Sequence, residues 1–124
     1  MSIPVKIEDL AKTLGDFDIA YLLTVGERGI KVVCVEVESD GETLRIPTAS
    51  KGTARNLEQN SSVTLMCPPR EPHGFTLLAD GTASGDGEGF RMVPATAVLH
   101  RPAAHSDGPV DADGCGQDCK PVGS

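Results

Sequence analysis

The chain has 124 residues, enough for one domain, and it is acidic: 11 Lys and Arg stand against 18 Asp and Glu, for a formal net charge of −7. This balance excludes a general nucleic-acid-binding role, which requires a cationic surface. We find no basic amphipathic segment, no apolar run near the ~20 residues that span a bilayer and no signal-peptide pattern, so we expect a cytoplasmic protein without nucleic-acid or membrane partners.

The first half of the chain predicts one helix and three strands. Four apolar residues share one face of a helix over residues 5–14, which Gly15 ends: Ile7, Leu10, Ala11 and Leu14. Apolar and β-branched runs predict strands over residues 19–25, 30–38 and 43–46. Tight turns are expected between them, at residues 26–29 and at Asp40-Gly41.

The second half predicts a helix over residues 50–59, with Ser50 as its N-cap, and three further strands. These cover residues 63–67, residues 75–84 with a bend at Asp80-Gly81, and residues 90–93, while residues 94–99 form a final turn or short strand. About six short strands with one helix in their middle are typical of an all-β antiparallel sandwich or barrel, and not of a parallel α/β sheet. Cys34 and Cys67 are predicted to be buried small hydrophobes.

The composition changes near residue 102. Residues 1–102 carry nearly all of the apolar periodicity and form the predicted domain, whereas residues 103–124 are rich in Gly, Pro and Asp and form an acidic tail. In the tail, Cys115 and Cys119 could join His105 as half a metal site, form a redox-sensitive disulfide, contact a dimer partner, or be two incidental thiols. Structural zinc sites use two such ligand pairs, so we predict no metal site and keep these three residues as the candidate ligands.

The segment between Glu42 and Glu58 contains no acidic residue, although the chain as a whole is acidic. On a helix that starts at Ser50, Lys51 and Arg55 lie four residues apart on one face, near the positive end of the helix dipole. Both features are unfavourable unless an anion binds there. Free N–H groups, hydroxyl groups and two cations together make a phosphate cradle. The alternative interpretation is a solvated basic face with a serine cap.

A wider pattern surrounds this cradle. A strand ends at Pro47-Thr48-Ala49, the motif Ser50-Lys51-Gly52-Thr53-Ala54-Arg55-Asn56-Leu57 follows, and a strand resumes at residues 62–65. This order resembles the pyridoxamine 5'-phosphate oxidase-like, FMN-binding split-barrel superfamily and its flavin and deazaflavin oxidoreductase group, over about residues 5–102. The resemblance implies a split antiparallel β-barrel of Greek-key type that forms a homodimer, with cofactor sites in grooves at the interface.

The resemblance also implies a cofactor. In this superfamily it is usually FMN, sometimes a deazaflavin coenzyme or FAD, and in some relatives haem; we expect FMN or a deazaflavin here, with FAD and haem as secondary alternatives. Lys51 and Arg55 would hold the phosphate, and strand 32–37 would pass near the ring. The predicted cofactor-binding residues are Thr48, Ser50, Lys51, Thr53, Arg55 and Asn56. Since the cofactor would carry the redox chemistry, we assign no catalytic acid or base.

Three functional hypotheses remain open. The first is a flavin- or deazaflavin-dependent oxidoreductase acting on a small-molecule substrate. The second is a non-catalytic cofactor-binding protein (a carrier, a sensor or a haem-handling protein), which the absence of Trp and the acidic residues Glu36 and Glu38 favour. The third is an assembly role, in which Lys51 and Arg55 pair with carboxylates across a dimer.

Overall fold

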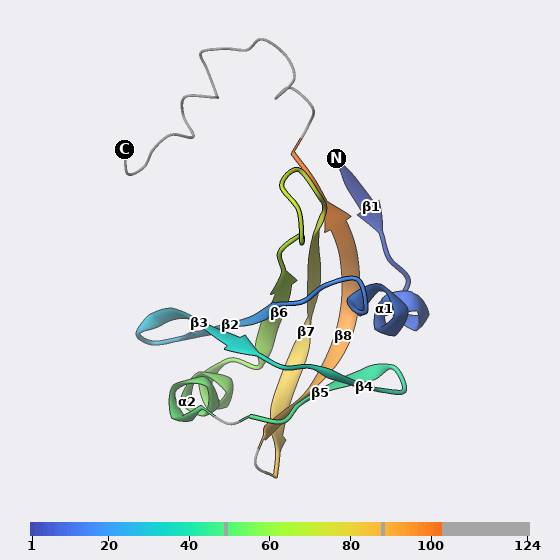
Figure 1. Ribbon diagram of the computed structural model, residues 1–124. Helices are drawn as coiled ribbons and strands as arrows, with labels where there is room; N and C mark the ends of the chain where they lie inside the picture. Colours follow the sequence, from blue (N-terminus) through green and yellow to red (C-terminus); the bar gives the residue numbers. More distant parts are fainter. Residues whose placement is uncertain (49, 88, 103–124) are drawn as a thin grey trace, which may run out of the picture.

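The structure is a computed structural model, and it describes residues 1–48, 50–87 and 89–102. Its elements are β1 (Ser2–Pro4), α1 (Ile7–Leu14), β2 (Ala20–Gly26), β3 (Gly29–Val35), β4 (Glu38–Asp40), β5 (Thr43–Ile46), α2 (Lys51–Gln59), β6 (Ser62–Cys67), β7 (Thr76–Asp86) and β8 (Gly89–His100). In the described residues the strands form one antiparallel sheet with the order β3-β2-β6-β7-β8-β5-β4, and β1 pairs with β8 outside this path (Figure 1). The predicted all-β class with two short helices is confirmed.

The chain changes its pairing partner between β3 and β4. Strand β3 pairs with β2 along its whole length, whereas β4 pairs with β5 at the other end of the strand order. Our prediction of one strand over residues 30–38 is therefore wrong at residues 36 and 37. There the chain has left β2, the partner of β3, and has not yet reached β5, the partner of β4. This crossover links the two ends of the sheet by a single short segment (Figure 1).

Strands β7 and β8 pair along their whole lengths with one irregularity. The register shifts after Asp80, so that Gly81 pairs with Pro94 while Asp80 pairs with Thr96. The predicted bend is confirmed, but β8 continues through Pro94, where we predicted that the strand would end. A bulge accommodates a residue that cannot donate to the ladder, and Gly81 has no Cβ that would strike the backbone of Val93.

Eight strands are present in the described ranges, against about six predicted. One additional strand arises because the predicted strand over residues 30–38 is divided into β3 and β4, and the other is β1. Strand β1 pairs Ile3 with Leu99, and backbone hydrogen bonds join Met1 to Arg101 in both directions. A three-residue strand has no detectable hydrophobic period, and its partner lies at the far end of the domain, so the sequence alone does not reveal it.

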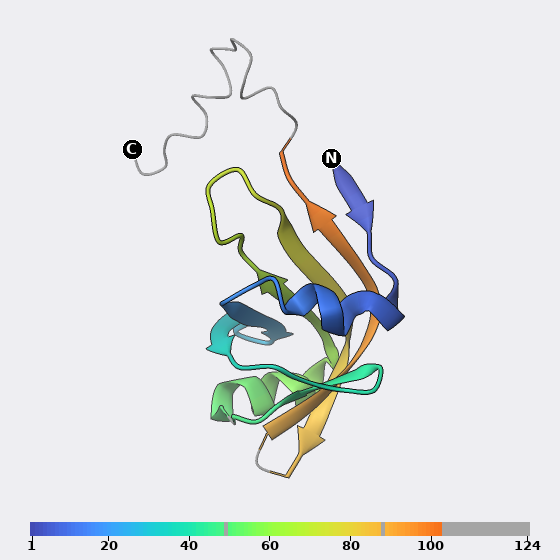
Figure 2. The ribbon, with the colours of Figure 1, turned by 45° about the vertical axis from the view of Figure 1, so that its right-hand side comes forward.

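Aliphatic side chains fill the interior, in agreement with the scarcity of aromatic residues. The largest fully buried side chains of the sheet are Leu22, Ile46, Leu65, Leu77 and Met92. Helix α1 packs on β8 and buries Leu10, while α2 packs on β2 and β7. Figure 2 shows α1 (blue) crossing in front of the sheet and α2 (green) lying below α1, so the two helices cover separate parts of the barrel.

One hydrogen bond in the core attaches α2 to the sheet. Asn56 Nδ2 donates to Thr24 Oγ1 at 3.0 Å, and both side chains are buried. Gly26 lies further along β2, where a Cβ would overlap the Asn56 carboxamide. Gln59 Oε1 also accepts the backbone N–H of Glu27 at 2.7 Å. Helix α2 is thereby fixed against the end of β2 and the turn that follows it.

The two cysteines of the described residues have different environments. Cys67 is 1% exposed, and burial raises the pKa of its thiol to about 11, so the thiol stays protonated at neutral pH. Cys34 is exposed, so our prediction that it is buried is wrong. The alternation of β3 decides this, because Val33 and Val35 take the inner face. The tail, with the candidate ligands His105, Cys115 and Cys119, lies outside the described residues.

We expect Asn56→Ala to lower the free energy of unfolding by about 1–3 kcal/mol, because the Thr24 hydroxyl is then buried without a partner. Thr24→Val should also destabilise the protein, since it leaves the Asn56 amide unpaired. The double variant should cost less than the sum of the single variants, because neither polar group is then stranded. Urea unfolding of the four proteins measures this coupling, and strictly additive costs would contradict it.

Candidate functional site

Helix α2 presents an N-terminus without negative charge. Ser50 is its N-cap, as predicted, and the Ser50 Oγ accepts the backbone N–H of Thr53 at 3.3 Å. The first turn contains no acidic residue. The remaining free N–H groups and the positive end of the helix dipole are therefore available to an anion.

A lysine from β3 lies over this first turn. Gly52 is the second residue of α2, and a Cβ placed on it would lie 2.7 Å from Lys31 Cε and 3.1 Å from Lys31 Nζ. The Lys31 side chain thus occupies the space that a larger residue at position 52 would fill. It reaches the helix from the inner face of the sheet, because Lys31 pairs with Thr24, the residue that Asn56 contacts.

Two further cations lie on α2 itself. Lys51 and Arg55 are exposed and stand one turn apart, so three cationic side chains belong to the first turns of the helix and the strand beside it. Among the residues that the structure describes, none of the three forms an ion pair. Like charges at this spacing repel one another, and a bound anion would remove the repulsion.

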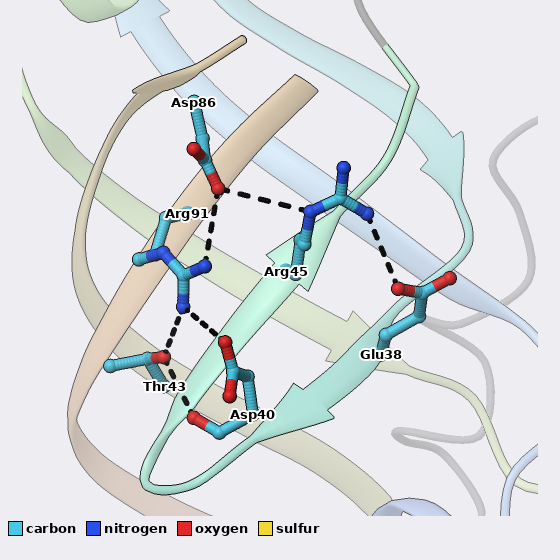
Figure 3. Close-up of polar contacts among 6 residues, drawn as sticks. All are labelled: Glu38, Asp40, Thr43, Arg45, Asp86 and Arg91. Carbon is cyan, nitrogen blue, oxygen red and sulfur yellow. Dashed lines mark hydrogen bonds and ion pairs between the residues drawn. The ribbon is translucent and has the colours of Figure 1, made fainter. Parts of the chain in front are cut away.

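A second group of arginines, shown in Figure 3, is already neutralised. Arg45 and Arg91 face each other on β5 and β8, and Asp86 bridges them at 3.8 Å from Arg45 Nε and 3.3 Å from Arg91 Nη2. Glu38 lies 3.3 Å from Arg45 Nη1, and Asp40 lies 3.0 Å from Arg91 Nη1. The hydrogen bond to Asp40 raises the pKa of Arg91. Arg45, although it belongs to the acid-free segment, is thus committed to carboxylates and separate from the candidate site.

Four of the six predicted cofactor-binding residues are accessible. Thr48, Lys51 and Arg55 are exposed, and Ser50 is half-buried at the cap. They follow one another from the end of β5 into the second turn of α2. The structure therefore leaves this part of the predicted set open to a ligand.

The other two predicted residues are buried beneath α2. Thr53 is 0% exposed, and its Oγ1 has no hydrogen-bond partner in the described residues. Asn56 is 8% exposed, and its amide is committed to Thr24. These positions hold the helix on the sheet and offer no surface to a ligand in this structure.

Lys31 is the site residue that the sequence analysis missed. A signal for it was present, because Lys31 alternates in the sequence with Val33, Val35 and Val37, and the two of these valines that lie on β3, Val33 and Val35, face inward. A charged residue in such a row requires an anionic partner or an opening in the barrel. The neighbourhood of α2 could not be inferred, since the contact depends on how two distant elements pack.

The described ranges contain no group of three His, Cys, Asp or Glu residues arranged to hold a metal ion. Within the same ranges, no helix has the length and apolar character needed to cross a membrane. The charges gathered at α2 are complementary to an anion.

No protein-family model matches the chain. Two uncharacterized proteins, one from Mycobacterium bovis and one from Mycobacterium tuberculosis, are each 37% identical to it over 133 aligned residues, which cover 93% of this chain and 92% of the relative. The chain belongs to the family of these mycobacterial proteins.

Two solved structures share its fold. A Listeria innocua protein, described as a candidate pyridoxamine 5'-phosphate oxidase, has a TM-score of 0.63 and 16% identity, and the match covers 76% of this chain and 98% of that one. An FAD-binding protein from Mycobacterium smegmatis has a TM-score of 0.59 and 13% identity, with 82% and 100% covered. The chain thus has the fold of these two proteins, and the split-barrel fold that the sequence motif predicted is confirmed.

We expect Asp86→Asn to lower the Tm at low ionic strength, because Arg45 and Arg91 then face each other without the carboxylate that bridges them. The loss should shrink near 1 M NaCl, where the screening length falls to about 3 Å. Asp16→Asn, which makes the same charge change at an exposed residue outside the network, serves as the control. Equal Tm values for the two variants at low salt would contradict a role of Asp86 in holding β5 to β8.

Proposed function

We propose that the chain binds a phosphorylated flavin-type cofactor, FMN or a deazaflavin coenzyme, with a phosphate group at the N-terminus of α2. The observation that carries this proposal is a helix start that has no acidic residue, with Lys51 and Arg55 exposed in the first two turns and Lys31 lying against Gly52. Free N–H groups and unpaired cations bind phosphate oxygens through charge-assisted hydrogen bonds.

The residues present fit a phosphate group. The three atoms nearest to the space beside Gly52 belong to the flexible end of the Lys31 side chain, which can shift to admit an oxygen atom. Thr48 and Ser50 add hydroxyl groups just before the helix. We assign Asn56 a positioning role, since its carboxamide is committed to the core.

The structural neighbours support a flavin-type ligand. One of them is described as an FAD-binding protein and the other as a candidate pyridoxamine 5'-phosphate oxidase, and both are aligned over nearly their whole lengths. FAD carries phosphate groups as FMN does, so it remains an alternative occupant of the same cradle. Haem offers carboxylates in place of phosphate and is the secondary alternative.

When bound, a flavin or deazaflavin would supply the redox chemistry, and the chain would supply binding and orientation. We therefore propose an oxidoreductase acting on a small molecule. The alternative is a carrier, sensor or haem-handling protein of the same fold. Glu36 favours it, because its carboxylate, exposed at the crossover after β3, would repel an anionic reduced ring. Glu38 adds less to this repulsion than the sequence alone suggested, since it pairs with Arg45.

We also propose the cytoplasm as the location of the protein. Cys34 and Cys67, the two cysteines of the described ranges, are both free thiols. Free thiols agree with a reducing compartment.

We expect the Lys51→Ala/Arg55→Ala double variant to lose about 2–4 kcal/mol of cofactor binding, because two charge-assisted contacts to phosphate disappear. Lys31→Met should lose a smaller part of the same free energy. Titrations with FMN, FAD, a deazaflavin coenzyme and haem, followed by fluorescence or absorbance, measure the effect. Lys6→Ala/Lys12→Ala, which removes two exposed lysines at and within α1, is the control for net charge.

The outcomes separate the three hypotheses. Saturable binding that is lost in the Lys51/Arg55 variant and kept in the control supports the phosphate site, and turnover with a reductant then distinguishes an oxidoreductase from a carrier or sensor. Unchanged cofactor binding in the Lys51/Arg55 variant would show that the site is misplaced. A variant that loses only its dimeric state would favour the assembly role.

We propose that the protein forms a homodimer through the outer face of β2 and β3. Three opposed pairs of residues make this face apolar: Val25 with Ile30, Leu23 with Val32, and Tyr21 with Cys34. The side chains of Ile30 and Val32 are 68% and 52% exposed. Apolar rows along an edge strand are usually covered by a partner. Members of the superfamily that the sequence resembles form homodimers, so we infer that the partner is a second copy of this chain.

We expect Val32→Glu to convert the dimer to a monomer, because it places a charge in the centre of the apolar face. Val93→Glu is a matched control, since Val93 on β8 has the same 52% exposure but lies outside that face. Sedimentation velocity over a range of concentrations gives the oligomeric state. A wild-type protein that remains monomeric throughout would overturn the dimer proposal.

A further inference from the structure

A recess that no residue of α2 lines lies at the crossover between β3 and β4. It has a volume of about 330 Å³, within the range of about 300–1,000 Å³ that is typical of small-molecule pockets. Its walls come from the end of α1, the start of β2 and the last residues of β3. Ala20 and Cys67 are the lining residues that are buried, so they form its floor.

The pocket is lined by both apolar and polar groups, and four of its side chains are large and apolar. Leu14 and Phe17 line one side, and Val35 and Val37 line the other. The thiol of Cys67 adds no charge, because burial raises its pKa to about 11 and it stays protonated at neutral pH. A ligand would therefore meet hydrocarbon and polar surface side by side, above a floor without charge.

The two ionisable groups at the rim are carboxylates with different roles. Asp18 accepts a hydrogen bond from Arg70 Nε at 3.1 Å, and Arg70 Nη2 donates to the backbone carbonyl of Gly15 at 3.3 Å. Arg70 thus neutralises Asp18 and fixes the turn that forms one wall. Glu36 is exposed and forms no ion pair in the described residues, so its charge is available.

We propose that this pocket binds a small apolar molecule that carries one cationic group, such as a primary amine, with Glu36 accepting the ammonium. The apolar part lies between Phe17 and Val35, where burial of hydrocarbon surface provides the affinity. The carboxylate at the rim selects the charge of the ligand, and the net charge of −7 disfavours anions further. This inference does not rest on the proposed phosphate site, because Lys31 lies four residues before Val35 on β3, roughly 13 Å away along the strand. A cofactor ring that extended along residues 32–37, as the family resemblance implies, would compete with the ligand for this pocket.

The test uses three probes that share a phenylethyl group and differ in charge: 2-phenylethylamine, 2-phenylethanol and 3-phenylpropionate. Each is titrated into the ¹⁵N-labelled full chain, and amide shifts are followed by NMR. We expect the amine to shift amides around Phe17, Ala20 and Val35, the alcohol to bind more weakly, and the carboxylate to leave them unchanged.

Variants of Glu36 test whether its negative charge determines which probe binds. Glu36→Gln should weaken amine binding by about fivefold, to the level of the alcohol, and Glu36→Lys should favour the carboxylate probe. Glu42→Gln and Glu42→Lys are matched controls, since Glu42 is an exposed glutamate in the β4–β5 turn outside the pocket. Equal effects of the Glu36 and Glu42 variants would overturn the assignment of Glu36.

A parallel titration with FMN keeps this proposal separate from the cofactor site. FMN at the proposed site shifts amides of Gly52 and Arg55, whatever the amine does, so either site can fail alone. Absence of shifts around Phe17 and Val35 with all three probes would overturn the pocket proposal. FMN that shifts those pocket amides and displaces the amine would also overturn it, because the pocket would then belong to the cofactor.

Discussion

The buried hydrogen bond from Asn56 to Thr24 determines where the first turn of α2 lies. It attaches the helix to the inner face of β2, and the absence of a Cβ at Gly26 allows the close approach. Because Thr24 pairs with Lys31 on β3, the same contact brings a strand lysine against the helix backbone at Gly52. The buried Asn56 amide thus positions α2 so that Lys31 lies beside the helix that carries Lys51 and Arg55.

The arrangement of charge around this helix follows from the same packing. Each of the arginines Arg45 and Arg91 has carboxylate partners on neighbouring strands, so their charges are compensated within the sheet. Lys51 and Arg55 stand on a helix whose first turn carries no acid, and Lys31 adds to them from β3. In a chain with a net charge of −7, this region carries positive charge and exposes the free backbone N–H groups of a helix start. That contrast is what a phosphate group would recognise.

Local signals in the sequence predicted the elements that local interactions determine. Ser50 as N-cap and the helix after it were predicted because a hydroxyl followed by a helical segment is sufficient to specify them. The bend after Asp80 was predicted because Gly81 follows it in the sequence. The continuation of β8 through Pro94 was not predicted, because it depends on the contact of Pro94 with Gly81 on the facing strand β7. Lys31 was missed for the same reason, since only the packing of α2 on β2 gives it a neighbour. The motif was sufficient to identify the split barrel, whereas the burial of Thr53 depends on which side of α2 meets the sheet.

The crossover after β3 both joins the two ends of the sheet and forms part of the recess above Ala20 and Cys67. Residues 36 and 37 must leave β2 and reach β5, so their backbone pairs with neither strand at this point. The side chains of Val35 and Val37 still face inward, and α1 does not fill the space before them, so a recess remains above Ala20 and Cys67. Along one short segment the chain therefore presents Lys31 beside a helix N-terminus and Glu36 at the recess. These two environments favour ligand groups of opposite charge, so a molecule suited to one of them is poorly suited to the other.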